Sequence, residues 1–143
     1  MIDAEIAVYD ELISRLQAKY AWAENNKVGF SNEYVEQPEK FPWVTIIEED
    51  NRTEERYHSS SAEENAARLT YQVDVYTNNG VNRKRDARTI MDAVDTEMIG
   101  MGFRRTYLNN VPDYVDVSIY RLIGRYTAIV EEREDEFLIY HRP

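Results

Sequence analysis

Apolar residues near the start of the chain recur at the spacing of an amphipathic helix. The stripe consists of Ile2, Ile6, Tyr9, Ile13, Leu16 and Tyr20. Intervals of three and four residues match the 3.6-residue repeat of an α-helix, and Val8 and Leu12 widen the stripe. Asp3 and Glu5 suit the positive N-terminal end of a helix dipole. The pattern predicts a helix from Ile2 to Tyr20 with one buried face.

The next part of the chain changes from polar to β-branched and back to charged. Residues 24–40 are polar and without periodicity, which is typical of a loop, and Val44–Ile47 is a run of strand length. Residues 48–68 are dominated by charged residues and Ser, with little that could be buried. Loops longer than ~12–15 residues are uncommon in compact domains and are often functional or disordered. We therefore predict a mobile loop or a long hairpin tip at 48–68.

A second strand and a second helix follow. Apolar and polar residues alternate from Leu69 to Tyr76, which predicts a strand with one apolar face, closed by a turn at 78–80. A helical stripe then recurs between Arg83 and Met101, where Gly100 and Gly102 favour termination. Its apolar members are Ala87, Ile90, Met91, Val94 and Met98.

The remaining pattern predicts two strands and a charged extension. Residues 103–108 and 117–130 have strand character, and the turn formers at 109–113 separate them. In the longer strand one side is apolar, and the other side carries Arg121, Arg125 and Thr127. We expect a charged C-terminal extension at 131–143 that adds a short edge strand or packs on a neighbouring subunit.

The order of these elements indicates an α+β fold. We predict one domain over residues 1–143, because this length supports one hydrophobic core but not two ordinary domains. Its sheet is mostly antiparallel, with about four to five strands, and two helices cover one face. The other face carries Arg, Gln, Thr and Tyr, so we expect it to meet water or a partner.

The composition and net charge of the chain argue against several classes of protein. The formal net charge of -10 would repel a nucleic-acid backbone, so specific nucleic-acid binding is not expected. The absence of cysteine excludes disulfides, thiolate zinc sites and a cysteine nucleophile. The acidic N-terminus lacks the features of a signal peptide, and no apolar run approaches the ~20 residues that span a bilayer. We expect a soluble protein, present in the cytoplasm where it is made, without membrane partners.

No residue pattern favours catalysis, a cofactor or a metal. The acidic pairs do not follow the spacing of a calcium loop, and His58 and His141 have no Ser or Asp arrangement beside them that indicates a triad. Pro112–Asp113 would suit a metal-dependent nuclease, but every lysine lies upstream of it. We predict no catalytic, cofactor or metal residues. A small metal-dependent nuclease stays as the alternative from a different class.

The cations, by contrast, suggest a contact surface. Arg83, Lys84 and Arg85 open the second predicted helix, where each costs ~0.3–1 kcal/mol against the helix dipole at low salt. Either they moderate the charge of an acidic domain or they meet an acidic surface. Basic and acidic segments in one chain suit a heterologous contact, which closes into a ring. The candidate interface residues are Arg83, Lys84, Arg85, Arg104, Arg105, Arg121, Arg125, Glu48, Glu49, Asp50, Glu54 and Glu55.

The order of the predicted helices and strands, together with their sequences, also resembles a known family. The segments Phe41–Ile46, Thr70–Tyr76, Ala87–Met98 and Arg125–Val130, in this order, resemble the tail terminator and head-tail joining proteins of long-tailed bacteriophages. The resemblance covers roughly residues 1–132. It implies a non-enzymatic virion protein that assembles in the host cytoplasm and forms a hexameric ring at the head-proximal end of the tail.

The resemblance also implies partners for such a ring. They are further copies of the chain, the tail tube protein, whose growth the ring stops, and the head connector protein, with room for DNA to pass through the ring. A head-tail connector or neck protein is the alternative within this class. A cytoplasmic protein-binding module is the alternative outside it.

Overall fold

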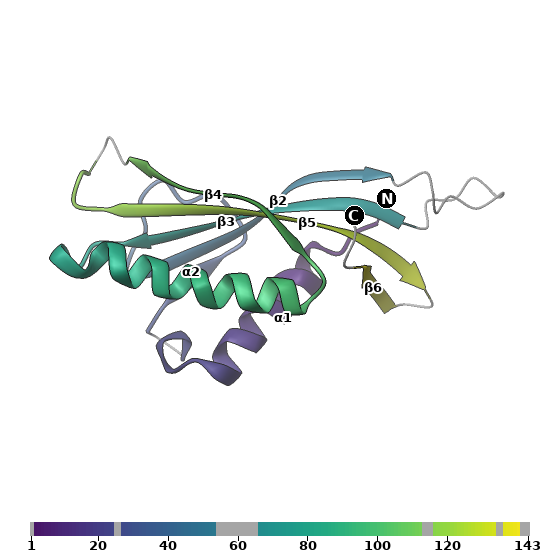
Figure 1. The fold of residues 1–143 in the computed structure, drawn as a ribbon, viewed down its shortest axis with the longest axis horizontal. Coiled ribbons are helices and arrows are strands. Elements are labelled where there is room, and N and C mark those ends of the chain that lie inside the picture. The colour runs from purple at the N-terminus through teal and green to yellow at the C-terminus, as the bar shows by residue number, and fades with distance from the viewer. Residues whose placement is uncertain (1, 25–26, 54–65, 113–115, 134–135, 141–143) are drawn as a thin grey trace.

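The computed structural model of the chain describes residues 2–24, 27–53, 66–112, 116–133 and 136–140. These residues form two α-helices and one six-stranded sheet (Figure 1). The helices are α1 (Glu5–Lys19) and α2 (Arg83–Gly100), with short 3-10 turns η1 (Ala21–Ala23) and η3 (Gly80–Asn82). The strands are β1 (Gly29–Ser31), β2 (Trp43–Thr53), β3 (Ala66–Thr77), β4 (Arg104–Pro112), β5 (Tyr120–Arg133) and β6 (Glu136–Tyr140).

The sheet is mostly antiparallel, as the sequence predicts, and the α+β class is confirmed. The strand order is β1-β2-β3-β5-β4, and β6 pairs with β5. Only β1 runs parallel to its neighbour, with Gly29 opposite Trp43. This three-residue strand lies within residues 24–40, where the polar pattern predicts only loop.

Strand β5 pairs with three other strands. Along one edge it pairs with β3, from Ala66 opposite Glu131 to Thr77 opposite Tyr120. Along the other edge β4 pairs with residues 120–127 and β6 with residues 129–133. Strands β4 and β6 therefore follow one another beside the same strand.

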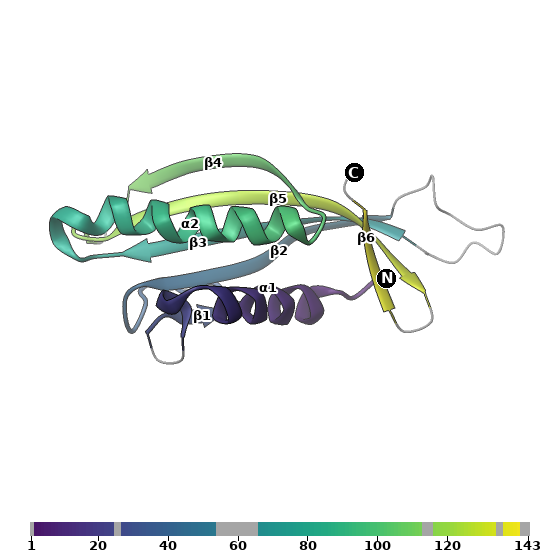
Figure 2. The same cartoon turned by 60° about the horizontal axis from the view of Figure 1, so that its bottom comes forward.

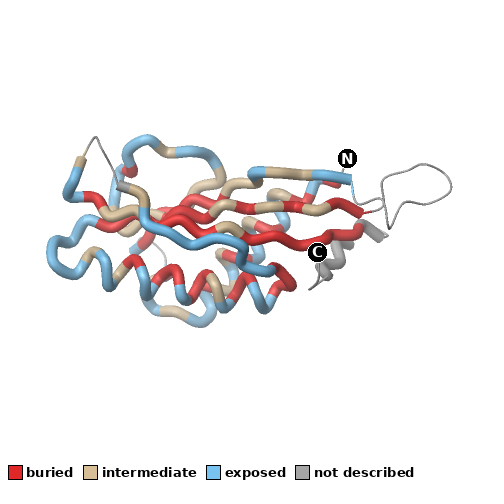
Figure 3. The backbone as a smooth tube through the Cα atoms, turned by 45° about the horizontal axis from the view of Figure 1, so that its top comes forward, coloured by how far each residue is buried: buried red, intermediate tan, exposed pale blue. Residues whose placement is uncertain are grey.

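Both helices lie on one face of the sheet, as predicted, and leave the other face without a helix (Figures 1 and 2). Helix α2 packs on β3 and β5, and α1 packs against α2 and β2. The apolar stripe predicted for α2 is confirmed, because all of its residues are buried. Figure 3 shows that buried residues concentrate in the central strands and on the inner sides of the helices.

The buried face of α1 differs from the predicted stripe. Val8, Leu12 and Leu16 point into the core, whereas Ile6 is 65% exposed. Tyr9 and Ile13 are only partly buried at the edge of the core. The 4-4 spacing of the fully buried residues, rather than the longer alternating series, therefore marks the side that meets the sheet.

Helix α2 ends in a Schellman motif. The Phe103 N–H donates to the Met98 carbonyl at 3.0 Å and the Gly102 N–H donates to the Ile99 carbonyl at 3.0 Å. Gly102 has φ +107, a left-handed conformation that a residue with a Cβ rarely adopts. The motif turns the chain directly into β4, so β4 runs back alongside α2 in the opposite direction.

A buried carboxylate joins the two helices. Lys19 Nζ donates to Glu97 Oε1 at 2.9 Å, Arg15 Nη1 lies 3.7 Å from the same oxygen, and Tyr20 donates to Glu97 Oε2 at 3.4 Å. The Glu97 side chain is only 3% exposed. Its hydrogen bond with Lys19 outweighs the cost of burial, so the pKa of Glu97 is lowered.

Three predicted boundaries need correction. Of the loop predicted at 48–68, residues 48–53 belong to β2 and 66–68 to β3, because the β2–β3 ladder continues to Thr53 opposite Ala67. Of the turn predicted at 109–113, residues 109–112 pair with β5. In the predicted extension at 131–143, residues 131–133 continue β5 and 136–140 form β6. The other residues of these ranges lie outside the described parts.

Candidate interaction surfaces

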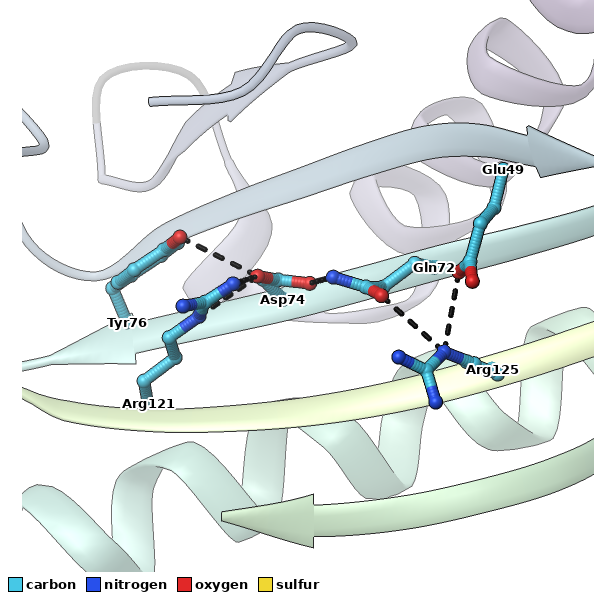
Figure 4. A network of polar contacts seen from close by, with 6 residues as sticks. All are labelled: Glu49, Gln72, Asp74, Tyr76, Arg121 and Arg125. Carbon is cyan, nitrogen blue, oxygen red and sulfur yellow. Dashed lines mark hydrogen bonds and ion pairs between the residues drawn. The ribbon is translucent and has the colours of Figure 1, made fainter. Parts of the chain in front are cut away.

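The helix-free face of the sheet carries a polar network centred on Asp74 (Figure 4). Strand alternation directs Asp74 to this face, since its neighbours Val73 and Val75 point into the core. Arg121, on the adjacent strand β5, donates to Asp74 Oδ2 through Nε at 2.9 Å and through Nη2. Gln72 Nε2 and the Tyr76 hydroxyl donate to the same carboxylate at 2.9 and 3.4 Å.

The network continues along β5 to Arg125. Its guanidinium donates to Glu49 Oε2 at 3.2 Å and to Gln72 Oε1 at 3.3 Å. It also lies 4.6 Å from the centre of the Tyr107 ring on β4, within the range of a cation–π contact. The network therefore connects side chains from β2, β3, β4 and β5 on one face.

The two charged side chains at the centre of this network are largely buried. The Asp74 side chain is 1% exposed and that of Arg121 is 20% exposed. Burial alone would lower the pKa of Arg121, but the hydrogen bond and charge of Asp74 raise it, so the guanidinium stays charged. Burial and the charge of Asp74 raise the pKa of the Tyr76 hydroxyl, which therefore stays neutral at physiological pH. The buried groups of the network therefore hold one another in place.

A groove of about 700 Å³ lies on the opposite side, between α2 and β4. Its apolar lining comes from Val81, Met91, Leu108 and Leu122. Three cations from the first two turns of α2 surround one end: Lys84, Arg85 and Arg88. Toward the other end, a smaller hollow beside Asp95 is lined by Ile99, Phe103, Arg104 and Arg105. Asp92 and Asp95 also line the groove. The first turns of α2 therefore form its basic end, and the other end combines apolar side chains with Arg104 and Arg105.

Only some of the cations around the groove are paired with carboxylates of the same chain. Arg105 Nη1 donates to Asp95 Oδ1 at 3.2 Å, and the same oxygen accepts from the Tyr126 hydroxyl at 3.1 Å. Arg85 lies 3.8 Å from Asp86. Within the described parts of the chain, Lys84, Arg88 and Arg104 have no carboxylate partner. The basic end of the groove is therefore available to an external anion.

The structure separates the predicted cations into two groups. Lys84, Arg85 and Arg105 meet in the groove, with Arg83 at the start of α2 and Arg104 in the neighbouring hollow. Arg121 and Arg125 lie on the other face, where intramolecular partners hold them. The predicted basic set is thus not one surface.

The predicted acidic set is also divided. The Tyr71 hydroxyl donates to Glu48 on the helix side of the sheet at 3.2 Å, and Glu49 pairs with Arg125 on the other side. Burial raises the pKa of Glu48. Asp50 pairs with Arg52 at 2.6 Å. Glu54 and Glu55 lie outside the described residues.

Two residues of these surfaces are not among those predicted. Arg88 lies one helical turn from Lys84, so a search for cations at i and i+4 rather than in a run would have found it. Asp74 is the acidic residue between two valines in a strand, which is a signal for a charge that needs a partner across the sheet.

The described residues contain no metal-like cluster and no membrane helix. No three His, Asp or Glu side chains among them gather closely enough to hold a metal ion. No helix in the described ranges has both the length and the apolar character of a membrane span. Neither a protein-family model nor a curated protein sequence matches the chain.

Proposed function

We propose that the chain is a structural virion protein, a tail terminator of a long-tailed bacteriophage. In this proposal several copies, six by the resemblance, form a ring at the head-proximal end of the tail tube. The ring stops tube growth and offers a docking surface to the head connector. The chain acts by assembly and not by catalysis.

The observation that carries the proposal is the basic end of the α2–β4 groove on an acidic chain. Lys84 and Arg88 have no internal carboxylate partner within the described parts, although acidic residues outnumber basic ones by 27 to 17. Cations at the start of a helix oppose its dipole, so local stability does not account for them. A contact with an acidic surface of another subunit does account for them, and such a head-to-tail contact closes into a ring.

The test is quantitative mass spectrometry on two particles purified from the parent phage. One is a tail that never met a head, and the other is a head that never received a tail. We expect a few copies of the chain on each free tail and none on free heads. Its presence on free heads would assign it to the connector or neck, and its absence from both would refute the proposal.

A further inference from the structure

We propose that the outer edge of β4 binds strand β6 of a second copy of this chain, antiparallel, with the groove beside α2 receiving its side chains. The inference rests on the proposed function, because a ring needs each subunit to offer two different surfaces to its neighbours. It adds the identity of those surfaces, which are two sheet edges of the same molecule.

The first observation is that β4 has an unpaired edge. Within the described parts of the chain β4 pairs with β5 alone, through eight of its nine residues. Arg104 and Arg105 at its start and Pro112 at its end are residue types that discourage unspecific edge pairing. Residues 106–111 between them carry no charge and are exposed or half-buried. This central part of the edge is suited to one selected strand.

The second observation is that β6 also has an unpaired edge. In the described residues β6 pairs only with β5, so its outer backbone groups are available to another strand. Its five residues fit within the nine of β4. In sequence it begins with Glu136 and continues with four apolar or aromatic residues.

The polarity of the groove selects the orientation. Because α2 and β4 run in opposite directions, Lys84 and Arg88 lie toward the end of β4, and Ile99 lies toward its start. An antiparallel strand brings its first residues to the end of β4. Glu136 would then approach the basic end, and the apolar residues of β6 would extend toward Ile99 and Phe103. Among the described residues, two cations without a carboxylate partner, Lys84 and Arg88, lie at the end of β4, whereas at its start only Arg104 lacks one, because Arg105 is paired with Asp95. The charge of Glu136 therefore favours this alignment over the reverse one.

The contact uses a different edge on each partner, so it is heterologous. A subunit that binds the β6 of one neighbour with its β4 still offers its own β6 to the next subunit. Repetition of this step generates a closed ring or an open filament, depending on the rotation between subunits. The backbone ladder would extend from one sheet into the next across each interface.

The first experiment measures self-association of the purified chain by sedimentation velocity and native mass spectrometry, at concentrations up to about 1 mM. We expect reversible oligomers. The double variant Lys84→Glu/Arg88→Glu should weaken association at least about tenfold, as should Glu136→Lys, because each places like charges together. Mixing the two should restore association. The matched control is Lys27→Glu. It reverses the charge of an exposed lysine that does not line the groove, so it should leave self-association unchanged.

The second experiment tests the strand pairing by cross-linking. The natural chain has no cysteine, so Asn110→Cys in β4, on the same face of the strand as the groove-lining Leu108, and Leu138→Cys in β6 introduce the only thiols. The two variants, carrying different tags, are mixed and oxidised. We expect disulfide-linked pairs that contain one copy of each, and far fewer when Lys27→Cys replaces Leu138→Cys. Circular dichroism of each variant confirms that it is folded.

The outcomes separate this inference from the proposed function. Two results would overturn the β4–β6 contact: a chain that remains monomeric at every concentration, or oligomers that neither respond to charge reversal nor cross-link at these positions. Neither result would decide whether the chain is present on free tails, which mass spectrometry tests separately. Specific cross-links in a chain that is absent from phage particles would support the contact and refute the function. Specific β4–β6 cross-links in a chain that native mass spectrometry finds only as a dimer would support the contact and exclude the ring.

Discussion

Removing the guanidinium of Arg121 should destabilise the fold far more than removing that of an exposed arginine. The carboxylate of Asp74 is 1% exposed in the natural chain, and Arg121→Leu removes its cationic partner. Gln72 and Tyr76 still donate to it, and neither carries a positive charge. Since a buried carboxylate without a counter-charge is costly, the folded state loses stability and the unfolded state is unaffected.

The size of the effect follows from burial. Breaking a buried ion pair by removing one partner costs ~3–5 kcal/mol, and pairs at the surface contribute ~0–1 kcal/mol. The Arg121 side chain is 20% exposed, so water can reach part of the site and we expect about 2–4 kcal/mol. For 143 residues the unfolding entropy is about 0.3 kcal/mol/K at the midpoint, so Tm should fall by about 7–13 °C.

Urea unfolding and calorimetry of four variants test the reasoning: Arg121→Leu, Asp74→Val, their double variant and a control. Arg52→Leu is the control, because Arg52 is 74% exposed and its pair with Asp50 should contribute under about 1 kcal/mol. The double variant Asp74→Val/Arg121→Leu removes both charges and should recover most of the loss. A cost below about 1 kcal/mol for Arg121→Leu, or a double variant that is as unstable as the sum of its single variants, would refute a coupled buried pair.

Three further changes test the core and the helix contact. Met98→Ala should cost ~2–5 kcal/mol in urea unfolding, because Met98 is fully buried between α2 and the sheet. Gly29→Ala should cost ~1–3 kcal/mol in calorimetry, because a Cβ there would lie 1.9 Å from the Trp43 ring. The pKa of Glu97 is lowered in the folded state, so the ionised carboxylate stabilises the fold above the ordinary pKa of 4.5. This stabilisation disappears as the pH falls through the lower pKa of the folded state. In urea unfolding at a series of pH values, Glu97→Gln should lose less stability on acidification than the natural chain.

Each of these three has a result that would contradict it. Met98→Leu keeps most of the volume and should cost less than Met98→Ala, so equal losses would argue against a cavity effect. An unchanged Tm in Gly29→Ala would mean that the Trp43 ring moves freely. Identical pH profiles for Glu97→Gln and the natural chain would show that Lys19 and Arg15 do not stabilise the carboxylate.

Strong periodicity made the central elements predictable. Helix α2 and strand β3 bury the residues that their patterns indicate, because each presents one apolar face to the same core. Ile6 of α1 shows the limit of this reasoning, since a stripe spaced by three and four residues includes both the centre and the margin of a face. Strand β1 was not predictable, because its three residues pair with β2 through contacts that leave no local signal.

The candidate interface was predictable only in part. The run Arg83–Arg85 stands out in an acidic chain, and Lys84 and Arg85 line one groove with Arg105, while their role in an interface stays a prediction. The sequence does not reveal that Arg121 and Arg125 already have intramolecular partners, because those depend on the register between β3 and β5. The edge of β4 was hidden by turn-forming residues such as Asn109 and Asn110, which the ladder with β5 holds in strand conformation.

The position of β5 between β3 and β4 has a consequence for the folding rate. The β3–β5 ladder joins residues 43 to 65 positions apart, from Thr77 with Tyr120 to Ala66 with Glu131. Contacts of such long range close large loops before they gain stability, and they slow folding. The β4–β5 hairpin, by contrast, forms from neighbouring residues and can dock as a unit. We expect an obligatory late step in which this hairpin meets β3, during which the edge of β3 stays open to mispairing with other chains.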